Sequence, residues 1–292
     1  MILIGENIHT LSKKISSAIE NRDPGPIRTL SSQQAEAGAH YLDINLGPLQ
    51  DKPAETAQWV VRTVQEVVDL PLCIDTPNPV ALEAALEICT KRAVINSANC
   101  TQEGKEKILP LAAKYPADVI ILIFSETGVP PTADERAESI LETIDYANDL
   151  GIPTENIWLD AVIYPIITNQ DQVKEYIEFV KIIEDVVPGT KTVTGISNVS
   201  SCGVPSDLRP ILNQTLFAIL DRYNQYAGIV DMRDRDLLRL NQGEPSHIVE
   251  LIHRAMEGEV DVSSFSKEAA RYVKTVNVLL GREIFSSSWL DM

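Results

Sequence analysis

Residues 72–75 read Leu-Cys-Ile-Asp, a short apolar run that stops at a carboxylate, and this form recurs along the chain. Seven further runs stop at one or two polar residues in the same way. They are ILIGEN (2–7), YLDIN (41–45), AVIN (93–96), VIILIFSE (119–126), IWLD (157–160), VTGISN (193–198) and GIVD (228–231). Longer segments, most with helical periodicity, separate successive runs. A strand followed by a helix, repeated eight times, predicts a closed parallel (β/α)8 barrel, the TIM barrel.

The segments between these runs carry the signals of amphipathic helices. Residues 24–38 have a proline near their start and Gly38 at their end, as helix-capping preferences require. Thr132 and Glu135 have the spacing of a capping box at the start of another helix. The pattern predicts helices over residues 24–38, 53–69, 78–91, 132–150, 171–187 and 206–226, and a last barrel strand that includes residues 229–230.

Length and composition favour a single domain over residues 1–292. The chain has 292 residues, of which 44% are hydrophobic, and a (β/α)8 barrel typically takes ~250 residues. We expect the barrel over about residues 1–240 and a C-terminal helical extension over about 244–285, with helices at 244–257 and 264–281 joined by an acidic loop at 257–261. The extension would either cover the barrel wall or form a dimer surface.

Charge and cysteine content narrow the class of protein. The chain carries 25 Lys and Arg against 42 Asp and Glu, a net charge of −17, which argues against nucleic acid as a partner because phosphate binding depends on Lys and Arg. No apolar run approaches the ~18 residues of a membrane span, and the start of the chain lacks the basic region of a signal peptide. Four irregularly spaced cysteines, Cys73, Cys89, Cys100 and Cys202, favour a reduced, cytoplasmic location.

Three of the strand-end residues suggest a ligand. Asp75, Asn96 and Asp160 end the third, fourth and sixth runs, so they should project into one barrel mouth. A carboxylate accepts two parallel N–H bonds, and an amide offers both a donor and an acceptor. Together they match the amino-pyrimidinone edge of a pterin. The alternative is that one or two of these residues cap the next helix, as Asp75 and Asn96 could, or satisfy backbone groups of a loop.

Other uses of the barrel mouth are less well supported by the sequence. Carboxylates suit magnesium or manganese, but His9 is the one histidine near a strand end, and we expect no metal site. Lys191 precedes the seventh strand and should point to the opposite face, which argues against a Schiff-base lysine. The glycine-containing segment 195–203 has no basic residue before Arg209, which argues against a phosphate-binding loop.

The order of the strand-end motifs resembles that of the pterin-binding barrel enzymes. More closely, it resembles the methyltetrahydrofolate:corrinoid protein methyltransferases. The motifs that carry the resemblance are GENIH (5–9), YLDINLG (41–47), LCIDTPN (72–78), VINSAN (94–99), WLDAV (158–162), TGISNVS (194–200) and RPILNQTLF (209–217). The chain departs from the pattern at His9, where the family often has Asn, and in a longer segment between Asn198 and Arg209.

The resemblance implies a fold, a reaction and partners. It implies a homodimeric (β/α)8 barrel that moves the N5-methyl group between 5-methyltetrahydrofolate and the cobalt of a corrinoid. The corrinoid should arrive on a separate protein, because this chain has no Asp-x-His-x-x-Gly signature of a corrinoid-binding module. The direction of transfer and the identity of the corrinoid protein stay open.

The resemblance also assigns roles to residues. Asp75, Asn96 and Asp160 would hold the pterin ring. Asn198 would be the catalytic residue, hydrogen-bonding N5 while cobalt(I) displaces the methyl group in an SN2 step. The remaining substrate-binding residues would be Gly195, Ser197 and Arg209. Glu6, Asp43 and Asn45 would contact the ligand-binding residues and help to position them.

Two alternative functions remain at this stage. A dihydropteroate synthase-like enzyme would share the pterin site, but it would need Arg or Lys near its pyrophosphate leaving group, and GISNVSSCG (195–203) has none. A non-catalytic folate-binding protein would also share the site. The presence of Asn198 favours catalysis over simple binding.

Overall fold

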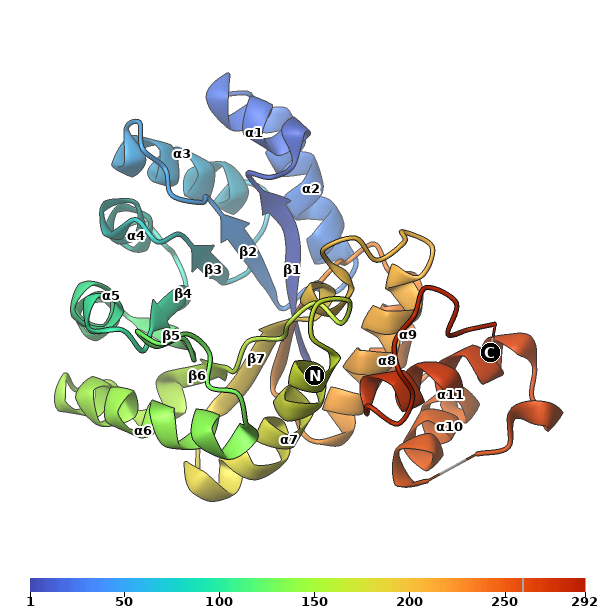
Figure 1. The fold of residues 1–292 in the computed structure, drawn as a ribbon. Coiled ribbons are helices and arrows are strands. Elements are labelled where there is room, and N and C mark those ends of the chain that lie inside the picture. Colours follow the sequence, from blue (N-terminus) through green and yellow to red (C-terminus); the bar gives the residue numbers. More distant parts are fainter. Residues whose placement is uncertain (259, 292) are drawn as a thin grey trace.

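The computed structural model describes residues 1–258 and 260–291 (Figure 1). In these residues the parallel strands close into a barrel in sequence order, with β8 returning to pair with β1. The strands are β1 (Ile2–His9), β2 (Tyr41–Asn45), β3 (Leu72–Asp75), β4 (Ala93–Asn99), β5 (Ala117–Leu122), β6 (Ile157–Asp160), β7 (Lys191–Gly195) and β8 (Ala227–Val230). The predicted (β/α)8 fold is confirmed.

Helices surround this barrel, and α10 and α11 lie outside its wall on one side (Figure 1). The helices are α1 (Lys13–Glu20), α2 (Pro24–Glu36), α3 (Pro53–Gln65), α4 (Pro79–Leu86), α5 (Gln102–Lys114), α6 (Ala133–Asp149), α7 (Gln170–Val186), α8 (Arg209–Arg222), α9 (Arg235–Asn241), α10 (Ser246–Glu257) and α11 (Lys267–Leu279). Short 3-10 turns occur at η1 (Thr154–Asn156), η2 (Ile196–Ser200) and η3 (Val262–Ser264).

The helix boundaries follow their capping residues. The capping box predicted at α6 is present, with the Thr132 hydroxyl accepting from the Glu135 N–H and the Glu135 carboxylate accepting from the Thr132 N–H. The helix predicted over 206–226 begins only at Arg209, with Pro210 in its first turn. The helix predicted over 78–91 ends at Leu86, because residues after it turn toward β4.

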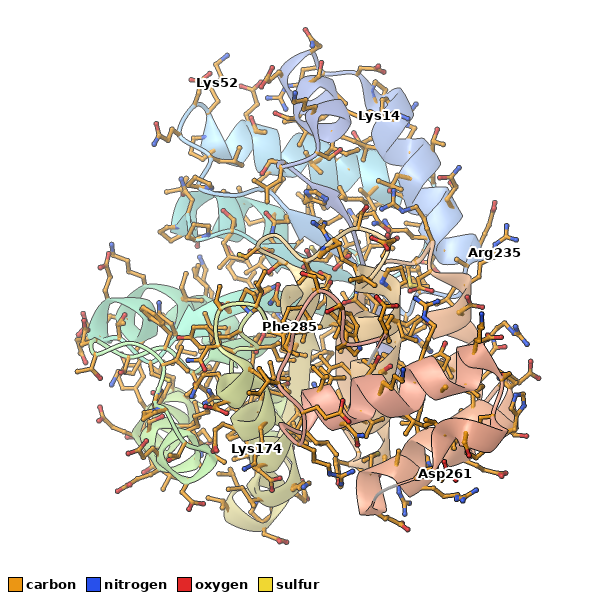
Figure 2. All side chains as sticks on the ribbon, turned by 45° about the vertical axis from the view of Figure 1, so that its right-hand side comes forward. Lys14, Lys52, Lys174, Arg235, Asp261 and Phe285 are labelled. Atoms are coloured by element: carbon orange, nitrogen blue, oxygen red, sulfur yellow. The ribbon has the colours of Figure 1, made fainter. Side chains whose placement is uncertain are left out.

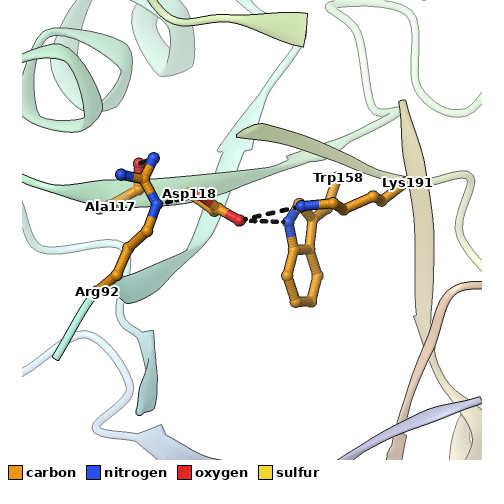
Figure 3. A network of polar contacts seen from close by, with 5 residues as sticks. All are labelled: Arg92, Ala117, Asp118, Trp158 and Lys191. Atoms are coloured by element: carbon orange, nitrogen blue, oxygen red, sulfur yellow. Dashed lines mark hydrogen bonds and ion pairs between the residues drawn. The ribbon is translucent and has the colours of Figure 1, made fainter. Parts of the chain in front are cut away.

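A polar network closes the end of the barrel opposite the mouth (Figure 3). Asp118 accepts hydrogen bonds from Arg92 Nε at 2.6 Å, from Trp158 Nε1 at 2.9 Å and from Lys191 Nζ at 3.4 Å. The Lys191 ammonium also lies 5.2 Å from the centroid of the Tyr226 ring. Lys191 therefore points to the face opposite the strand ends, as predicted.

The C-terminal extension covers the barrel wall at α7 and α8. Helices α10 and α11 pack against α8, and the Tyr272 hydroxyl donates a 2.8 Å hydrogen bond to Gln214 of α8. Gln170 at the start of α7 donates to the carbonyl oxygens of Val278 and Glu283 at 2.7 and 2.6 Å. The extension therefore does cover the wall, one of the two roles expected of it. The predicted loop at 257–261 includes residue 259, which lies outside the described residues.

Two further features concern the whole described chain. Within residues 1–258 and 260–291, no helix combines the length and apolar character needed to cross a membrane. The four cysteines are free thiols, and Cys73 is buried inside the barrel whereas Cys202 is exposed.

Candidate functional site

A cavity of about 370 Å³ lies at the carboxyl ends of the strands. We call it the mouth. Its lining contains nearly every residue that the sequence singled out, contributed by six of the strands and the turn η2. These residues are Glu6, Asp43, Asn45, Asp75, Asn96, Asp160, Gly195, Ser197 and Asn198. Its volume falls in the lower range of small-molecule pockets, ~300–1,000 Å³.

The strand register aligns three of these side chains in one row. Asn45 pairs with Asp75 across β2 and β3, and Asp75 pairs with Asn96 across β3 and β4. The Asn45 amide donates a hydrogen bond to Asp75 Oδ2. Asp43 lies two residues before Asn45, on the same face but one layer deeper, and accepts a 3.3 Å hydrogen bond from the Asn96 amide. The row therefore presents a carboxylate between two amides.

Burial shifts the pKa values of Asp75, which lies in this row, and of Asp43, which lies below it. Burial raises the pKa of Asp75 to about 6. Burial also raises the pKa of the fully enclosed Asp43 well above its usual range, and the negative charge of Asp75 raises it further. Of the two, Asp75 ionises more readily and is the carboxylate available to a ligand.

Neither Asp75 nor Asn96 caps a helix. The cap of α4 is Asn78, whose Oδ1 accepts from the N–H groups of Val80 and Ala81 at 3.0 and 3.2 Å. The cap of α5 is Thr101, whose hydroxyl accepts from Gly104. The capping alternative is therefore wrong, and both strand-end side chains are available to a ligand in the mouth.

One oxygen of the Asp160 carboxylate is held by hydrogen bonds. Its Oδ1 accepts from the Val162 N–H at 2.8 Å and from the Thr194 hydroxyl at 3.2 Å, whereas its Oδ2 accepts nothing from the described residues. Burial raises the pKa of Asp160 to about 6. Val162 has a φ of 63°, a left-handed conformation that is strained for a β-branched residue. This strained turn directs the Val162 N–H at Asp160 and orients the carboxylate.

Asn198 presents an unengaged amide to the mouth. It lies exposed in η2, directly after β7, and its side-chain amide forms no hydrogen bond with a described residue. Gly195 leaves room for it, since a Cβ at Gly195 would lie 3.1 Å from Asn198 Nδ2. A donor and an acceptor therefore lie at the rim, with no hydrogen-bond partner among the described residues.

Glu6 accepts a hydrogen bond from Ser197, the residue before Asn198. The Ser197 hydroxyl donates a 2.9 Å hydrogen bond to Glu6 Oε2. Burial raises the pKa of Glu6 to about 7, although the bond from Ser197 and the positive charge of Arg233 act in the opposite direction. Glu6 therefore changes charge near neutral pH while it anchors the turn that carries Asn198.

Arg209 lies outside the mouth. It lines an adjacent cavity of about 740 Å³, which shares Glu6 and Ser197 with the mouth. Its Nε donates a 2.9 Å hydrogen bond to the Val204 carbonyl. The structure thus brings together the predicted site residues except Arg209, which lines the adjacent cavity instead.

The mouth also contains residues that the strand-end pattern did not indicate. Leu11 and Ile229 line it, and so does His9. Leu11 is 90% exposed and lies in the turn after β1, where no periodicity marks it. Conversely, the strand-end residue Glu126 accepts from the Gln102 N–H and does not line the mouth.

The charge of the mouth restricts its ligands. Its described lining holds four carboxyl groups, Glu6, Asp43, Asp75 and Asp160, and no Lys or Arg. Such a surface favours ligands with N–H donors over phosphates. Among the described residues, no group of three or more His, Cys, Asp or Glu side chains has a geometry that could hold a metal ion.

Sequence comparisons identify related enzymes. The methylcorrinoid:tetrahydrofolate methyltransferase of Eubacterium limosum is 27% identical over 240 residues, which cover 82% of this chain and 88% of that protein. Methionine synthases of Mycobacterium leprae and Mycobacterium tuberculosis are each 26% identical over 240 residues, or 78% of this chain. The chain spans only 20% of the length of these two synthases.

Solved structures share the fold at low identity. DHPS from Yersinia pestis with a pterine-sulfa conjugate superposes with a TM-score of 0.61 at 16% identity, over 84% of this chain and 93% of that one. Dihydropteroate synthase from Xanthomonas albilineans in complex with 7,8-dihydropteroate superposes with a TM-score of 0.56 at 15% identity, over 83% of this chain and 92% of that one. A family model described as pterin binding enzyme matches residues 10–220. The resemblance seen in the sequence is thereby confirmed: the chain belongs to the pterin-binding enzyme family.

Proposed function

We propose that this protein is a methyltransferase that moves the N5-methyl group between 5-methyltetrahydrofolate and the cobalt of a corrinoid carried on a separate protein. The relative with the largest mutual coverage described above is named for the same pair of substrates. The observation that carries the proposal is the unengaged Asn198 amide beside the row of Asn45, Asp75 and Asn96, in a mouth without cations among its described lining.

The pterin ring would bind along this row. The ionised Asp75 would accept two N–H bonds from the amino-pyrimidinone edge, and Asn96 would offer both a donor and an acceptor to the same ring. Asp160 would accept a further N–H through Oδ2, the oxygen that no described residue uses. Each of these side chains is already held by neighbouring residues, so little conformational entropy would be lost on binding.

Asn198 would act on the bond that breaks. In the step, the N5–methyl bond would break with its electron pair staying on N5, which would take up a proton from solvent to give tetrahydrofolate, while the electron pair of cobalt(I) would form the new cobalt–methyl bond. The amide N–H of Asn198 would donate to N5 and strengthen this hydrogen bond as the electron pair localises. An interaction that grows in the transition state raises kcat rather than affinity alone.

The two alternative functions receive less support. A dihydropteroate synthase-like reaction must stabilise a departing pyrophosphate, and the described lining of the mouth has four carboxyl groups and no cation. A non-catalytic folate-binding protein would have no need of an unengaged amide beside N5.

The direct test uses purified protein, cob(I)alamin and 5-methyltetrahydrofolate under anaerobic conditions. We expect the protein to accelerate the loss of cob(I)alamin absorbance in proportion to its concentration. Tight binding of 5-methyltetrahydrofolate without acceleration, either with cob(I)alamin or with a corrinoid protein encoded beside this one, would instead support a folate-binding protein.

We also propose that the chain folds as one domain and forms a homodimer. The contacts of α10 and α11 with α8 support the first proposal, and the family resemblance supports the second. Light scattering coupled to gel filtration measures the oligomeric state, and a monomer at micromolar concentration would contradict the dimer.

A further inference from the structure

A second cavity adjoins the mouth on the side of α1 and α2. It has a volume of about 410 Å³ and shares His9 with the mouth. We call it the β1 pocket. The pairing of β1 with β2 shifts register between Gly5 and Ile8, which is the mark of a β-bulge that redirects side chains. Glu6 therefore lines the mouth, whereas the next residue, Asn7, lines the β1 pocket.

The two cavities have opposite charge. The described lining of the β1 pocket contains Lys14 and Arg233 and no Asp or Glu. Asp231 holds the Arg233 guanidinium from outside the lining, with two contacts of 2.8 Å. Lys14 lies exposed on α1 (Figure 2) and forms no ion pair with a described residue. In a chain of net charge −17, a pocket whose charged lining residues are Lys14 and the Asp231-paired Arg233 favours an anionic group near Lys14.

The floor of the β1 pocket contains polar atoms without partners. Asn7 is only 6% exposed, yet its Oδ1 has no hydrogen-bond partner among the described residues, and neither has the buried Nδ1 of His9. Buried polar atoms are almost always hydrogen-bonded, so such a pair indicates a missing partner. The pocket thus combines unsatisfied polar atoms at its floor with a cation at its rim.

Part of the pocket wall is apolar. Ile15 of α1 and Pro26 and Leu30 of α2 line it. A ligand with an apolar part, polar groups and a negative charge would match this mixed lining.

We propose that the β1 pocket binds the aminobenzoyl-glutamate end of the folate whose pterin ring occupies the mouth. This inference rests on the proposed function. The aromatic ring would pass His9, the residue common to both cavities, and lie against the apolar walls. The amide of the ligand would meet Asn7, and its carboxylates would lie near Lys14 and Arg233. The substrate class is then a folate with an intact glutamate tail rather than a simple pterin.

The test compares a ligand with the tail and a ligand without it. Calorimetry measures the affinities of tetrahydrofolate and of 6-methyltetrahydropterin, which lacks the aminobenzoyl-glutamate, for three proteins. These are the natural protein, Lys14→Glu and the matched control Lys13→Glu, which makes the same charge change one residue earlier at an exposed position outside the pocket lining.

We expect Lys14→Glu to weaken tetrahydrofolate binding about five- to tenfold and to leave tetrahydropterin binding unchanged. Lys13→Glu should leave both affinities unchanged. Equal losses in the two variants, or no loss in Lys14→Glu, would overturn the proposal.

The binding experiment and the methyl-transfer assay can fail independently of each other. If the protein discriminates the two ligands through Lys14 but does not transfer a methyl group, the pocket assignment stands and the proposed reaction fails. If it transfers the methyl group while Lys14→Glu binds tetrahydrofolate normally, the reaction stands and the pocket assignment fails.

Discussion

The Ser197 hydroxyl donates a 2.9 Å hydrogen bond to the Glu6 carboxylate and thereby joins the turn after β7 to the end of β1. These residues are far apart in sequence, and Glu6 and Ser197 line both the mouth and the adjacent cavity that contains Arg209. Because Asn198 follows Ser197 directly, this bond also fixes the position of the amide that we propose acts on N5. The charge of Glu6 therefore matters for both stability and catalysis.

Glu6→Gln should stabilise the protein at alkaline pH. A carboxyl group whose pKa is raised on folding stabilises the fold fully below its unfolded pKa, and this contribution is lost as the pH rises through the folded pKa. For Glu6 the window runs from 4.5 to about 7. Gln stays neutral and can still accept from Ser197, so the gain should appear above pH 7, on the order of 2 kcal/mol.

Urea unfolding at pH 5 and pH 8 measures this gain. The control is Glu36→Gln, at an exposed position of α2. A Glu6→Gln effect that is equal at both pH values would show that the Glu6 carboxyl does not titrate in this window.

Asp75→Asn should weaken folate binding. The substitution replaces a charge-assisted acceptor with a neutral amide and leaves one N–H of the pterin without a strong partner. The loss should be about 1.5–3 kcal/mol, or roughly 10- to 100-fold in Kd. Calorimetry with tetrahydrofolate measures it, with Asp51→Asn at an exposed position as control. Unchanged affinity would mean that the ring binds elsewhere.

Folate affinity should rise as the pH increases through about 6. Burial raises the pKa values of Asp75 and Asp160 to about 6, and their ionised forms accept N–H bonds from the pterin more strongly than their protonated forms. Below this pH both groups become protonated and affinity falls. Measuring the Kd of tetrahydrofolate from pH 5 to pH 8 tests this, and a flat profile would exclude ionised Asp75 and Asp160 as the acceptors.

Gly195→Ala should slow methyl transfer more than it weakens binding. The added Cβ would lie 3.1 Å from Asn198 Nδ2, so the amide must shift by a few tenths of an ångström. A small displacement of a preorganised donor lowers kcat, here by about tenfold. Single-turnover rates and tetrahydrofolate affinity separate the two effects, and a normal rate would show that Asn198 needs no fixed position.

The strand-end residues were predictable because two simple rules place them. Side chains alternate along a strand, and parallel strands of a barrel end at one mouth, so Asp75, Asn96 and Asp160 followed from their positions in the sequence. The capping role considered for Asp75 could not be decided in this way, because Asn78 and Asp75 are both good caps and only the backbone path selects Asn78.

Other features depend on geometry that the pattern does not encode. The bulge in β1 directs Glu6 and Asn7 into different cavities. The left-handed Val162 occurs at a β-branched residue, where sequence rules predict the opposite. Glu126 follows the end of β5 by several residues and Arg209 begins α8, so neither lies at the end of a strand and neither lines the mouth.

The rate of methyl transfer by Asn198→Ala tests the central claim most directly. Stopped-flow measurement of cob(I)alamin loss with 5-methyltetrahydrofolate gives this rate, and calorimetry gives the affinity for the folate. We predict a rate lower by about 10²–10³-fold with near-normal affinity, because the amide would act mainly in the transition state. An unchanged rate in Asn198→Ala would contradict the account.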